Sequence, residues 1–340
     1  MTRAHFEGLK AGVMSAMSML LEKGPLMLSE TVFSSPEAMA LLTEKFDLLI
    51  SEAFVFQEPL LAFAHHFGCP SVVLNPVGYT NHLNHYTGSA INPAYVPFFF
   101  VPGVNPENFL DRLVNTIMTI GAMSIYHTFY LYKANARMQE VFPGAPPIQQ
   151  LIKNVSLTLL NNNNALTDPI PLAPSVLEVG GLHIKPGQPL PPSLKQWIEN
   201  SKDGFVYFSL GSILKSDLLP HEKQDAIFKS FGKLKQRVLV KWDGKVPSSA
   251  PKNCRFEKWV PQQAVLAHPN LRVFVSHGGL LSIQESLYFG AAMIAMPVFG
   301  DQHMNTAMST KRGISVKVAL SELTTELLEA ALIEVIYNPK

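Results

Sequence analysis

Glycines and hydrogen-bonding side chains gather where an expected strand in the second half of the chain ends. His277-Gly278-Gly279 follows this strand and begins an expected helix over residues 280–289. A helix amino terminus with adjacent glycines lets backbone N–H groups approach an anion, and a diphosphate fits that geometry. His277 adds one donor. Glu285, about one and a half helical turns beyond Gly279, offers a carboxylate to ribose hydroxyls.

Other expected strands end in side chains that suit the remaining parts of such a ligand. Trp259 presents an indole face that can stack on a flat base, and Gln262 lies close enough in sequence to bond to base or sugar. Asp301 accepts hydrogen bonds, and Gln302 both donates and accepts, as recognition of a polyhydroxylated ring requires. Ser212 lies in a small-residue turn that admits a ligand closely. Each of these features alone is more often structural.

The elements that must position these residues form an alternating pattern. Strands are expected at residues 205–209, 238–241, 255–257, 272–276 and 293–297, with helices between them. Such alternation predicts a parallel, doubly wound α/β sheet, whose ligands bind beyond the carboxyl ends of the strands. The candidate residues should therefore meet at one edge of the sheet.

Composition and length limit the classes of protein that fit. The chain has 340 residues, of which 47% are hydrophobic and 16% charged, so intrinsic disorder is excluded and two domains are expected. A net charge of +1 without a basic run argues against nucleic-acid binding. Cys69 and Cys254 are too few for a disulfide framework or a cysteine-rich metal site. A Pro- and Gly-rich stretch places the border near Pro186, giving domains 1–185 and 186–340.

The sequence pattern of the first half of the chain predicts a βαβ unit followed by long helices. After a helix to about residue 21, a strand at 46–51, a helix at 58–66 and a strand at 71–74 are expected. Four prolines in residues 92–107 predict an irregular loop with an exposed or ligand-facing apolar tip at Phe98-Phe99-Phe100, before helices over 108–141. An uncharged run between Arg112 and Lys133 contains polar residues, which favours a buried or membrane-skimming helix over a bilayer span.

The order and spacing of the motifs from Trp259 to Gln302 resemble the signature of the UDP-glycosyltransferases, with insect-type enzymes most similar. This resemblance implies the glycosyltransferase B-type fold, in which two Rossmann-like domains face a cleft, with the amino-terminal domain incomplete here. It further implies that a UDP-sugar binds mainly to the second domain. The expected reaction transfers a hexose to a hydroxyl of a small lipophilic acceptor with inversion; glucose is favoured, and glucuronic acid stays open.

The resemblance also assigns roles to individual residues. Uracil would stack on Trp259, and the other contacts would come from these residues: Gln262 to the nucleoside, His277 and Gly279 to the diphosphate, Glu285 to ribose, Asp301 and Gln302 to the sugar, and Ser212 beside the nucleotide. Lys241 occupies a position where relatives often carry Arg, and Lys keeps the charge without the bidentate fork. Leu281 stands where many relatives have Asn.

The first half lacks one part of this machinery. Relatives use a histidine in the first βα loop as general base, charged by an acidic residue, and Glu52 resembles that acid. The histidine has no counterpart: His5 lies in a helical pattern, and His65 and His66 fit a helix face. We therefore expect a chain truncated at both ends that retains much of the donor site but does not catalyse efficient transfer.

The resemblance suggests no metal or cofactor, and an endoplasmic reticulum membrane location, although no clear signal peptide or carboxyl-terminal anchor is present in this sequence. Membrane-surface contact and homo- or hetero-oligomers stay open, as does glycosylation at the sequon Asn154-Val-Ser156. The sequence contains neither the G-x-G-x-x-G motif of a nicotinamide dehydrogenase nor the G-x-S-x-G motif of a serine hydrolase, which argues against both classes. The remaining alternative is a non-catalytic UDP-sugar-binding fragment or a regulatory partner of full-length subunits.

Overall fold

The computed structural model describes residues 24–338, except positions 53, 55, 90, 91, 100–103 and 213. The chain forms two compact units, Met1–Gly180 and Gly181–Lys340. This division lies in the same Gly- and Pro-rich stretch as the border expected after residue 185. The helix expected up to about residue 21 lies outside the described residues.

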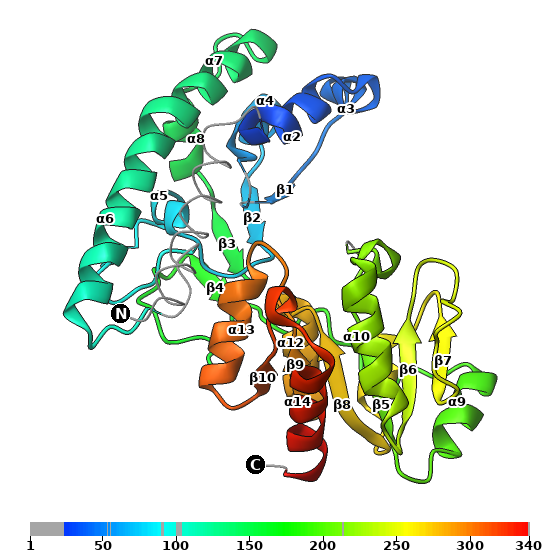
Figure 1. Cartoon of the computed structure of the whole chain (residues 1–340). Coiled ribbons are helices and arrows are strands. Elements are labelled where there is room, and N and C mark those ends of the chain that lie inside the picture. The colour runs from blue at the N-terminus through cyan, green and yellow to red at the C-terminus, as the bar shows by residue number, and fades with distance from the viewer. Residues whose placement is uncertain are drawn as a thin grey trace. The chain divides into compact units, whose positions relative to one another are not determined.

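The first unit contains a four-stranded parallel sheet in the order β1-β2-β3-β4, shown in Figure 1. Its strands are β1 (Leu49–Glu52), β2 (Ser71–Asn75), β3 (Leu157–Leu160) and β4 (Val176–Glu178). Its helical segments are α2 (Gly24–Phe33), α3 (Pro36–Ala40), η1 (Leu41–Thr43), η2 (Glu58–Leu61), α4 (Ala62–Phe67), η3 (Asn81–Leu83), α5 (Asn84–Thr87), α6 (Phe109–Ile125), the π-helical η4 (Tyr126–Tyr130), α7 (Leu131–Val141) and α8 (Ile148–Lys153).

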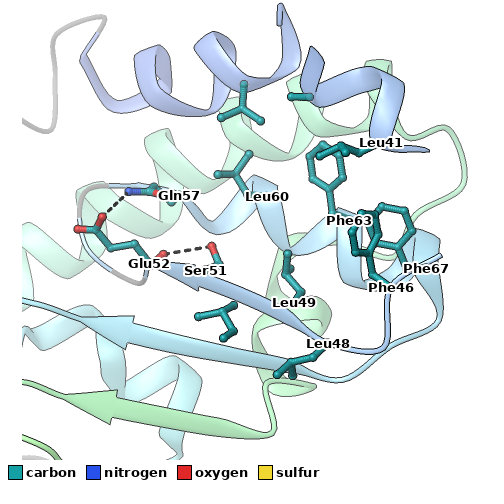
Figure 2. Close-up of a pocket in the computed structure, with 13 residues that line it drawn as sticks. Leu41, Phe46, Leu48, Leu49, Ser51, Glu52, Gln57, Leu60, Phe63 and Phe67 are labelled. Carbon is teal, nitrogen blue, oxygen red and sulfur yellow. Dashed lines mark hydrogen bonds between the residues drawn. The ribbon is translucent and has the colours of Figure 1, made fainter. Parts of the chain in front are cut away.

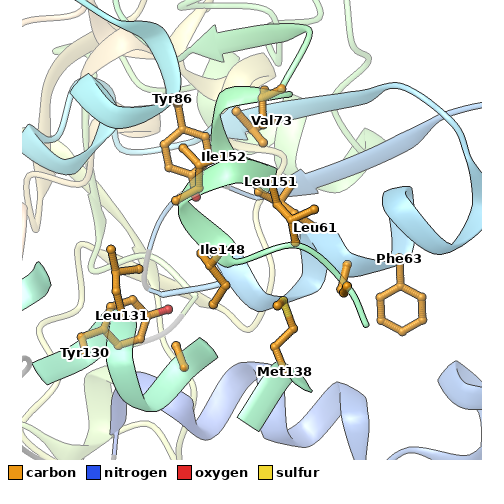
Figure 3. Close-up of a cluster of buried hydrophobic side chains, with 14 of the residues drawn as sticks. Leu61, Phe63, Val73, Tyr86, Tyr130, Leu131, Met138, Ile148, Leu151 and Ile152 are labelled. Atoms are coloured by element: carbon orange, nitrogen blue, oxygen red, sulfur yellow. The ribbon is translucent and has the colours of Figure 1, made fainter. Parts of the chain in front are cut away.

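The expected βαβ unit is confirmed as β1, η2 with α4, and β2, although β1 begins three residues later than predicted. Gly68 ends α4 in the left-handed conformation, with φ +64°, which glycine adopts without a steric penalty. The core of this unit gathers apolar side chains from α4, α7, α8 and β2, as Figure 3 shows around Leu61, Met138 and Ile152.

The helices expected over 108–141 are confirmed, and a buried amide explains the polar interruption of their apolar run. Asn115 on α6 is fully buried. Its Nδ2 donates to the carbonyls of Pro93 and Val96 at 2.6 and 2.8 Å, and its Oδ1 accepts from the Phe98 N–H at 2.7 Å. The side chain therefore fixes the loop that precedes the helix. Within the described part of the chain, helices that combine the length and hydropathy needed to cross a bilayer are absent.

Of the two alternatives for the tip of this loop, exposed or ligand-facing, the exposed one is wrong for the two phenylalanines that the structure describes. Phe98 and Phe99 are each only 5% exposed. Besides the bond from Phe98 to Asn115, the Phe99 N–H donates to Oδ1 of Asn81 at 3.1 Å. Proline content predicted the irregular backbone correctly, but the two amide side chains that draw the loop inward come from distant helices.

The second unit is the parallel, doubly wound sheet that the sequence predicted, in the order β10-β9-β8-β5-β6-β7. Its strands are β5 (Phe205–Ser209), β6 (Arg237–Lys241), β7 (Cys254–Glu257), β8 (Leu271–Ser276), β9 (Met293–Ala295) and β10 (Ser315–Lys317). Its helical segments are α9 (Pro192–Glu199), η5 (Ser216–Leu218), α10 (His221–Gly232), α11 (Gln262–Leu266), α12 (Leu280–Phe289), α13 (Gln302–Lys311), η6 (Leu320–Glu322) and α14 (Thr325–Tyr337).

Alternating side chains of the central strands form two apolar layers. Val206 and Phe208 of β5 belong to the core that α10 and α14 cover. The intervening Tyr207 points to the opposite face, because successive side chains of a strand alternate, and its ring stacks on Phe274 of β8 at 5.0 Å. The Tyr207 hydroxyl reaches Gln262 of α11 at 3.3 Å, so α11 covers that face. Burial on both faces explains the continuous apolar runs of these strands.

Candidate functional site

The second sheet reverses its strand order between β5 and β8. From β5 the chain moves outward through β6 to β7, whereas from β8 it moves in the other direction through β9 to β10. Ligands of doubly wound sheets bind in the crevice beyond the carboxyl ends of the strands at such a switch point. The residues after β5 and β8 are therefore at the place where a ligand site is expected.

His277 lies at this switch point between two glycines. A Cβ atom built on Gly211, which follows β5, would stand 2.7 Å from Cε1 of His277, and one built on Gly279 would stand 2.6 Å from Nε2. Both glycines are thus required for the imidazole to fit. Burial lowers the pKa of His277 to about 4, so the ring is neutral near pH 7 and offers one N–H donor.

The turn after His277 begins helix α12 as the sequence predicted. Gly279 is the N-cap residue of α12, and Gly278 has a φ of +79° and packs against Thr306 of α13. The first N–H groups of a helix have no partner within the helix, and the helix dipole favours an anion there. The helix ends at Gly290, which has a φ of +66°.

Glu285 of α12 is 7% exposed and is held by two glutamines of α11. Gln262 donates to its Oε2 at 2.6 Å, and Gln263 donates to its Oε1 at 2.9 Å. Burial opposes ionisation of the carboxyl group, but the nearby His183 ring and the hydrogen bonds from Gln262 and Gln263 outweigh burial and lower the pKa of Glu285. The structure thus brings Gln262 and Glu285, two candidates from separate motifs, into direct contact around an ionised carboxylate.

Trp259, in the connection between β7 and α11, is 76% exposed, which leaves its ring open to a stacking partner. Its neighbour Val260 is 4% exposed and anchors the connection in the core. A tryptophan that served only the core would be buried, because burial of so large a ring normally stabilises the fold. The exposure of Trp259 is therefore unusual for that role.

Asp301 ends the connection between β9 and α13, and Gln302 begins α13. Oε1 of Gln302 accepts hydrogen bonds from the backbone N–H groups of Val298 and Phe299 at 2.9 and 3.2 Å, so this amide oxygen holds the connection itself. Asp301 accepts a hydrogen bond from Asn305 at 2.6 Å. Burial raises the pKa of Asp301, and the bond from Asn305 partly opposes that rise.

Lys241 and Ser212 differ in their surroundings. Lys241, the last residue of β6, is 7% exposed and pairs with Asp243 at 2.7 Å. Asp243 also accepts from the backbone and hydroxyl of Ser216, both at 3.2 Å. Burial opposes the ionisation of Asp243, but Lys241 and Ser216 outweigh it and lower its pKa. Ser212 is exposed in the turn after β5.

Sequence reasoning missed Gln263, His183 and Asp243. Gln263 adjoins the candidate Gln262, and Asp243 follows the candidate Lys241 by two residues, so proximity was the available signal for both. His183 lies in the Pro- and Gly-rich stretch, whose composition gives no sign of a contact with Glu285. Its Nε2 lies 3.5 Å from Oε1 of Glu285, across about a hundred residues of sequence.

In the first unit, Glu52 ends β1 and lines a cavity of about 320 Å³, drawn in Figure 2. Burial raises the pKa of Glu52, and a hydrogen bond of 3.2 Å from Gln57 partly opposes that rise. The rest of the lining is mainly apolar and, among the described residues, includes no histidine: Val32, Ala38, Leu41, Phe46, Leu48, Leu49, Ile50, Ser51, Leu60, Phe63 and Phe67.

The structure also places His65 and His66 on α4, as the sequence predicted. Both side chains are exposed, and Nε2 of His66 lies 2.9 Å from the carbonyl oxygen of Leu42. Among the residues that the structure describes, groups of three or more His, Cys, Asp or Glu side chains suited to a metal ion are absent.

Comparison with known proteins decides the family. Residues 7–340 match the family model described as "UDP-glucoronosyl and UDP-glucosyl transferase". The chain belongs to this family. It is 34% identical to "UDP-glycosyltransferase UGT5" of Dactylopius coccus, an alignment that covers 88% of this chain and 57% of that protein. It is 32% identical to "UDP-glucuronosyltransferase 2B17" of Rattus norvegicus, covering 92% of this chain and 59% of that protein.

The UDP-glycosyltransferase chain described here thus spans less than two thirds of the length of these relatives. Solved structures show the same fold. A UDP-glucose:anthocyanidin 3-O-glucosyltransferase in complex with UDP matches with a TM-score of 0.58 and 18% identity, covering 93% of this chain and 71% of that one. An indoxyl-glucosylating UDP-glucosyltransferase from Polygonum tinctorium matches with a TM-score of 0.60 and 16% identity, covering 92% and 72%. The fold is therefore the B-type glycosyltransferase fold, with parallel sheets in both units.

Proposed function

We propose that the second unit binds a UDP-sugar at the switch point between β5 and β8, and that the reaction served is transfer of the hexose, with inversion, to a hydroxyl of a small lipophilic acceptor. The observation that carries this proposal is the position of His277. It sits where a doubly wound sheet receives its ligand, beside the amino terminus of α12 and between two obligatory glycines.

The remaining roles follow from the surroundings of each side chain. The exposed face of Trp259 would stack on uracil, with Gln262 beside the nucleoside and Glu285 accepting from ribose. Asp301 and the amide nitrogen of Gln302 would bind sugar hydroxyls, because Oε1 of Gln302 is already occupied by backbone. Ser212 and Lys241 would lie near the nucleotide, with no metal or cofactor in the reaction.

Glucose is the donor sugar that we favour over glucuronic acid. The support is the relative from Dactylopius coccus named "UDP-glucosyltransferase 2", which is 30% identical and covers 95% of this chain and 63% of that protein. The mammalian relative named as a glucuronosyltransferase keeps the second donor open. The acceptor would be apolar, as the lining of the cavity beside Glu52 suggests.

We further propose that this chain transfers sugar poorly. Glu52 is placed to charge a histidine base, but none of the described residues lining its cavity is a histidine. The alternative function is therefore a non-catalytic UDP-sugar binder or a regulatory partner of full-length subunits. Family membership leads us to propose the endoplasmic reticulum membrane as the compartment and detoxification as the context, with membrane contact and oligomers left to experiment.

Two measurements test these proposals. Titration calorimetry should detect UDP binding to the purified chain. A transfer assay with UDP-glucose, UDP-glucuronic acid and a phenol should then detect little product. Absence of UDP binding would overturn the donor site, whereas turnover at the rate of a full-length relative would overturn only the proposed inactivity.

A further inference from the structure

Glu285 is attached to a chain segment that the proposed donor site does not include. Gln263 of α11 bridges the two: its Oε1 accepts from the backbone N–H of Lys185 at 2.7 Å, and its Nε2 donates both to the carbonyl of His183 at 3.2 Å and to Oε1 of Glu285 at 2.9 Å. The segment before α9 is thus fastened to the carboxylate by one amide side chain.

His183 approaches the same carboxylate oxygen with its ring. Nε2 of His183 lies 3.5 Å from Oε1 of Glu285, which is longer than an ordinary hydrogen bond. This nitrogen is buried and has no other hydrogen-bond partner. At 3.5 Å the ring borders the carboxylate without occupying one of its hydrogen-bonding positions, and its nitrogen faces the edge of Glu285.

The acceptor capacity of Glu285 explains why this contact matters. Each carboxylate oxygen accepts about two hydrogen bonds. Oε2 has one from Gln262 and Oε1 has one from Gln263, which leaves one position on each oxygen. A vicinal diol donates two hydrogen bonds to a carboxylate when one hydroxyl faces each oxygen. His183 borders Oε1 and therefore determines in which direction the second hydrogen-bonding position of that oxygen points.

We propose that His183 is a positioning residue that enables Glu285 to recognise both hydroxyls of a ribose, so that this chain prefers ribonucleoside over 2′-deoxyribonucleoside diphosphates. The inference rests on the proposed UDP-sugar function and deepens it. Gln262 holds Oε2, whereas Gln263 and His183 both border Oε1, so that the carboxylate is fixed in one orientation toward the diol. Without His183, Glu285 turns and accepts from one hydroxyl only.

The test compares binding of UDP and 2′-deoxy-UDP by titration calorimetry. The native chain should prefer UDP by roughly tenfold, the value of one hydrogen bond to a charged group. In His183→Ala the preference should fall to about twofold, chiefly through weaker UDP binding. His183→Gln, whose amide can donate from a similar position, should restore most of it. His221→Gln, an exposed histidine at the start of α10, is the matched control and should behave as the native chain.

The ratio of the two affinities separates positioning from folding. Partial unfolding of a variant lowers the active fraction for both nucleotides alike and leaves their ratio unchanged. An unchanged ratio in His183→Ala overturns the inference, as does an equal ratio in His183→Ala and His221→Gln. A cycle with Glu285→Gln adds a second criterion: if His183 acts through Glu285, its substitution has no further effect on the ratio in that background. Failure of the native chain to bind either nucleotide would instead overturn the proposed function itself.

Discussion

The imidazole of His277 lies directly against Gly211, so closely that a Cβ atom at position 211 would stand 2.7 Å from its Cε1 atom. The two residues follow the ends of neighbouring strands, β5 and β8, on the two sides of the point where the strand order reverses. Their contact therefore lies at the place where a ligand of this sheet is expected.

Gly211→Ala should destabilise the second unit and displace His277. The added methyl group collides with the ring, and the φ of +82° at this position disfavours any residue with a Cβ, so the free energy of unfolding should fall by about 2–3 kcal/mol. Gly313→Ala is the matched control, because its φ is +72° but its Cβ would meet no atom within 4 Å, and it should cost about 1 kcal/mol. Chemical denaturation compares the two. Equal losses would contradict the collision.

Trp259→Ala should weaken UDP binding without lowering stability. The ring is 76% exposed, so its removal should change the free energy of unfolding by less than about 0.5 kcal/mol, whereas loss of stacking on a base should cost about 1–3 kcal/mol of binding. Calorimetry and thermal denaturation measure the two quantities. Tyr337→Ala, which removes another exposed aromatic ring, should leave UDP binding unchanged. Unaltered binding in Trp259→Ala would argue against the stacking role.

His277 should make the second unit less stable in acid. The unfolded histidine has a pKa of about 6.5 and the folded one a pKa of about 4, so between these values the unfolded state binds more protons. Stability should therefore fall as the pH decreases from about 6.5 towards 4, by up to about 3 kcal/mol from this residue. Denaturation at several pH values should show a shallower dependence in His277→Gln than in the native chain, with His221→Gln as control.

Binding of UDP should raise the pKa of His277, because a diphosphate beside the ring stabilises its protonated form. An NMR titration of the imidazole C–H signal, assigned by its loss in His277→Gln, measures the pKa with and without UDP. A value that stays near 4 when the nucleotide is bound would place the diphosphate away from this ring.

Asn115→Leu should loosen the loop before α6. The substitution fills similar space but removes three hydrogen bonds and leaves the backbone groups of Pro93, Val96 and Phe98 without their partner. A loss of about 2–4 kcal/mol is expected, together with faster hydrogen exchange at residues 92–99. Ser124→Ala, on the exposed side of the same helix, should change neither. Protection of residues 92–99 equal to that of the native chain would show that the loop is held by other contacts.

The sequence by itself determined the elements whose pattern is local. The buried strand at 205–209 and the helix at 280–289 were predicted with their observed bounds, because apolar runs, N-terminal glycines and a terminal glycine act on their own neighbours. The short edge strands β4 and β10 were missed, since three residues carry too little pattern to stand out from a loop. The order of the motifs likewise indicated the family, which the comparison confirmed.

Only the tertiary structure decided which side chains meet. Sequence reasoning placed Gln262 and Glu285 on one ligand, but it gave no indication that Gln263 and His183 surround the same carboxylate. It also left Phe98 at an exposed or ligand-facing tip, and did not indicate that Asn115 draws the backbone inward. These contacts join residues far apart along the chain, and their free energy is gained only once the sheets bring the segments together. Local sequence propensity therefore cannot predict these contacts.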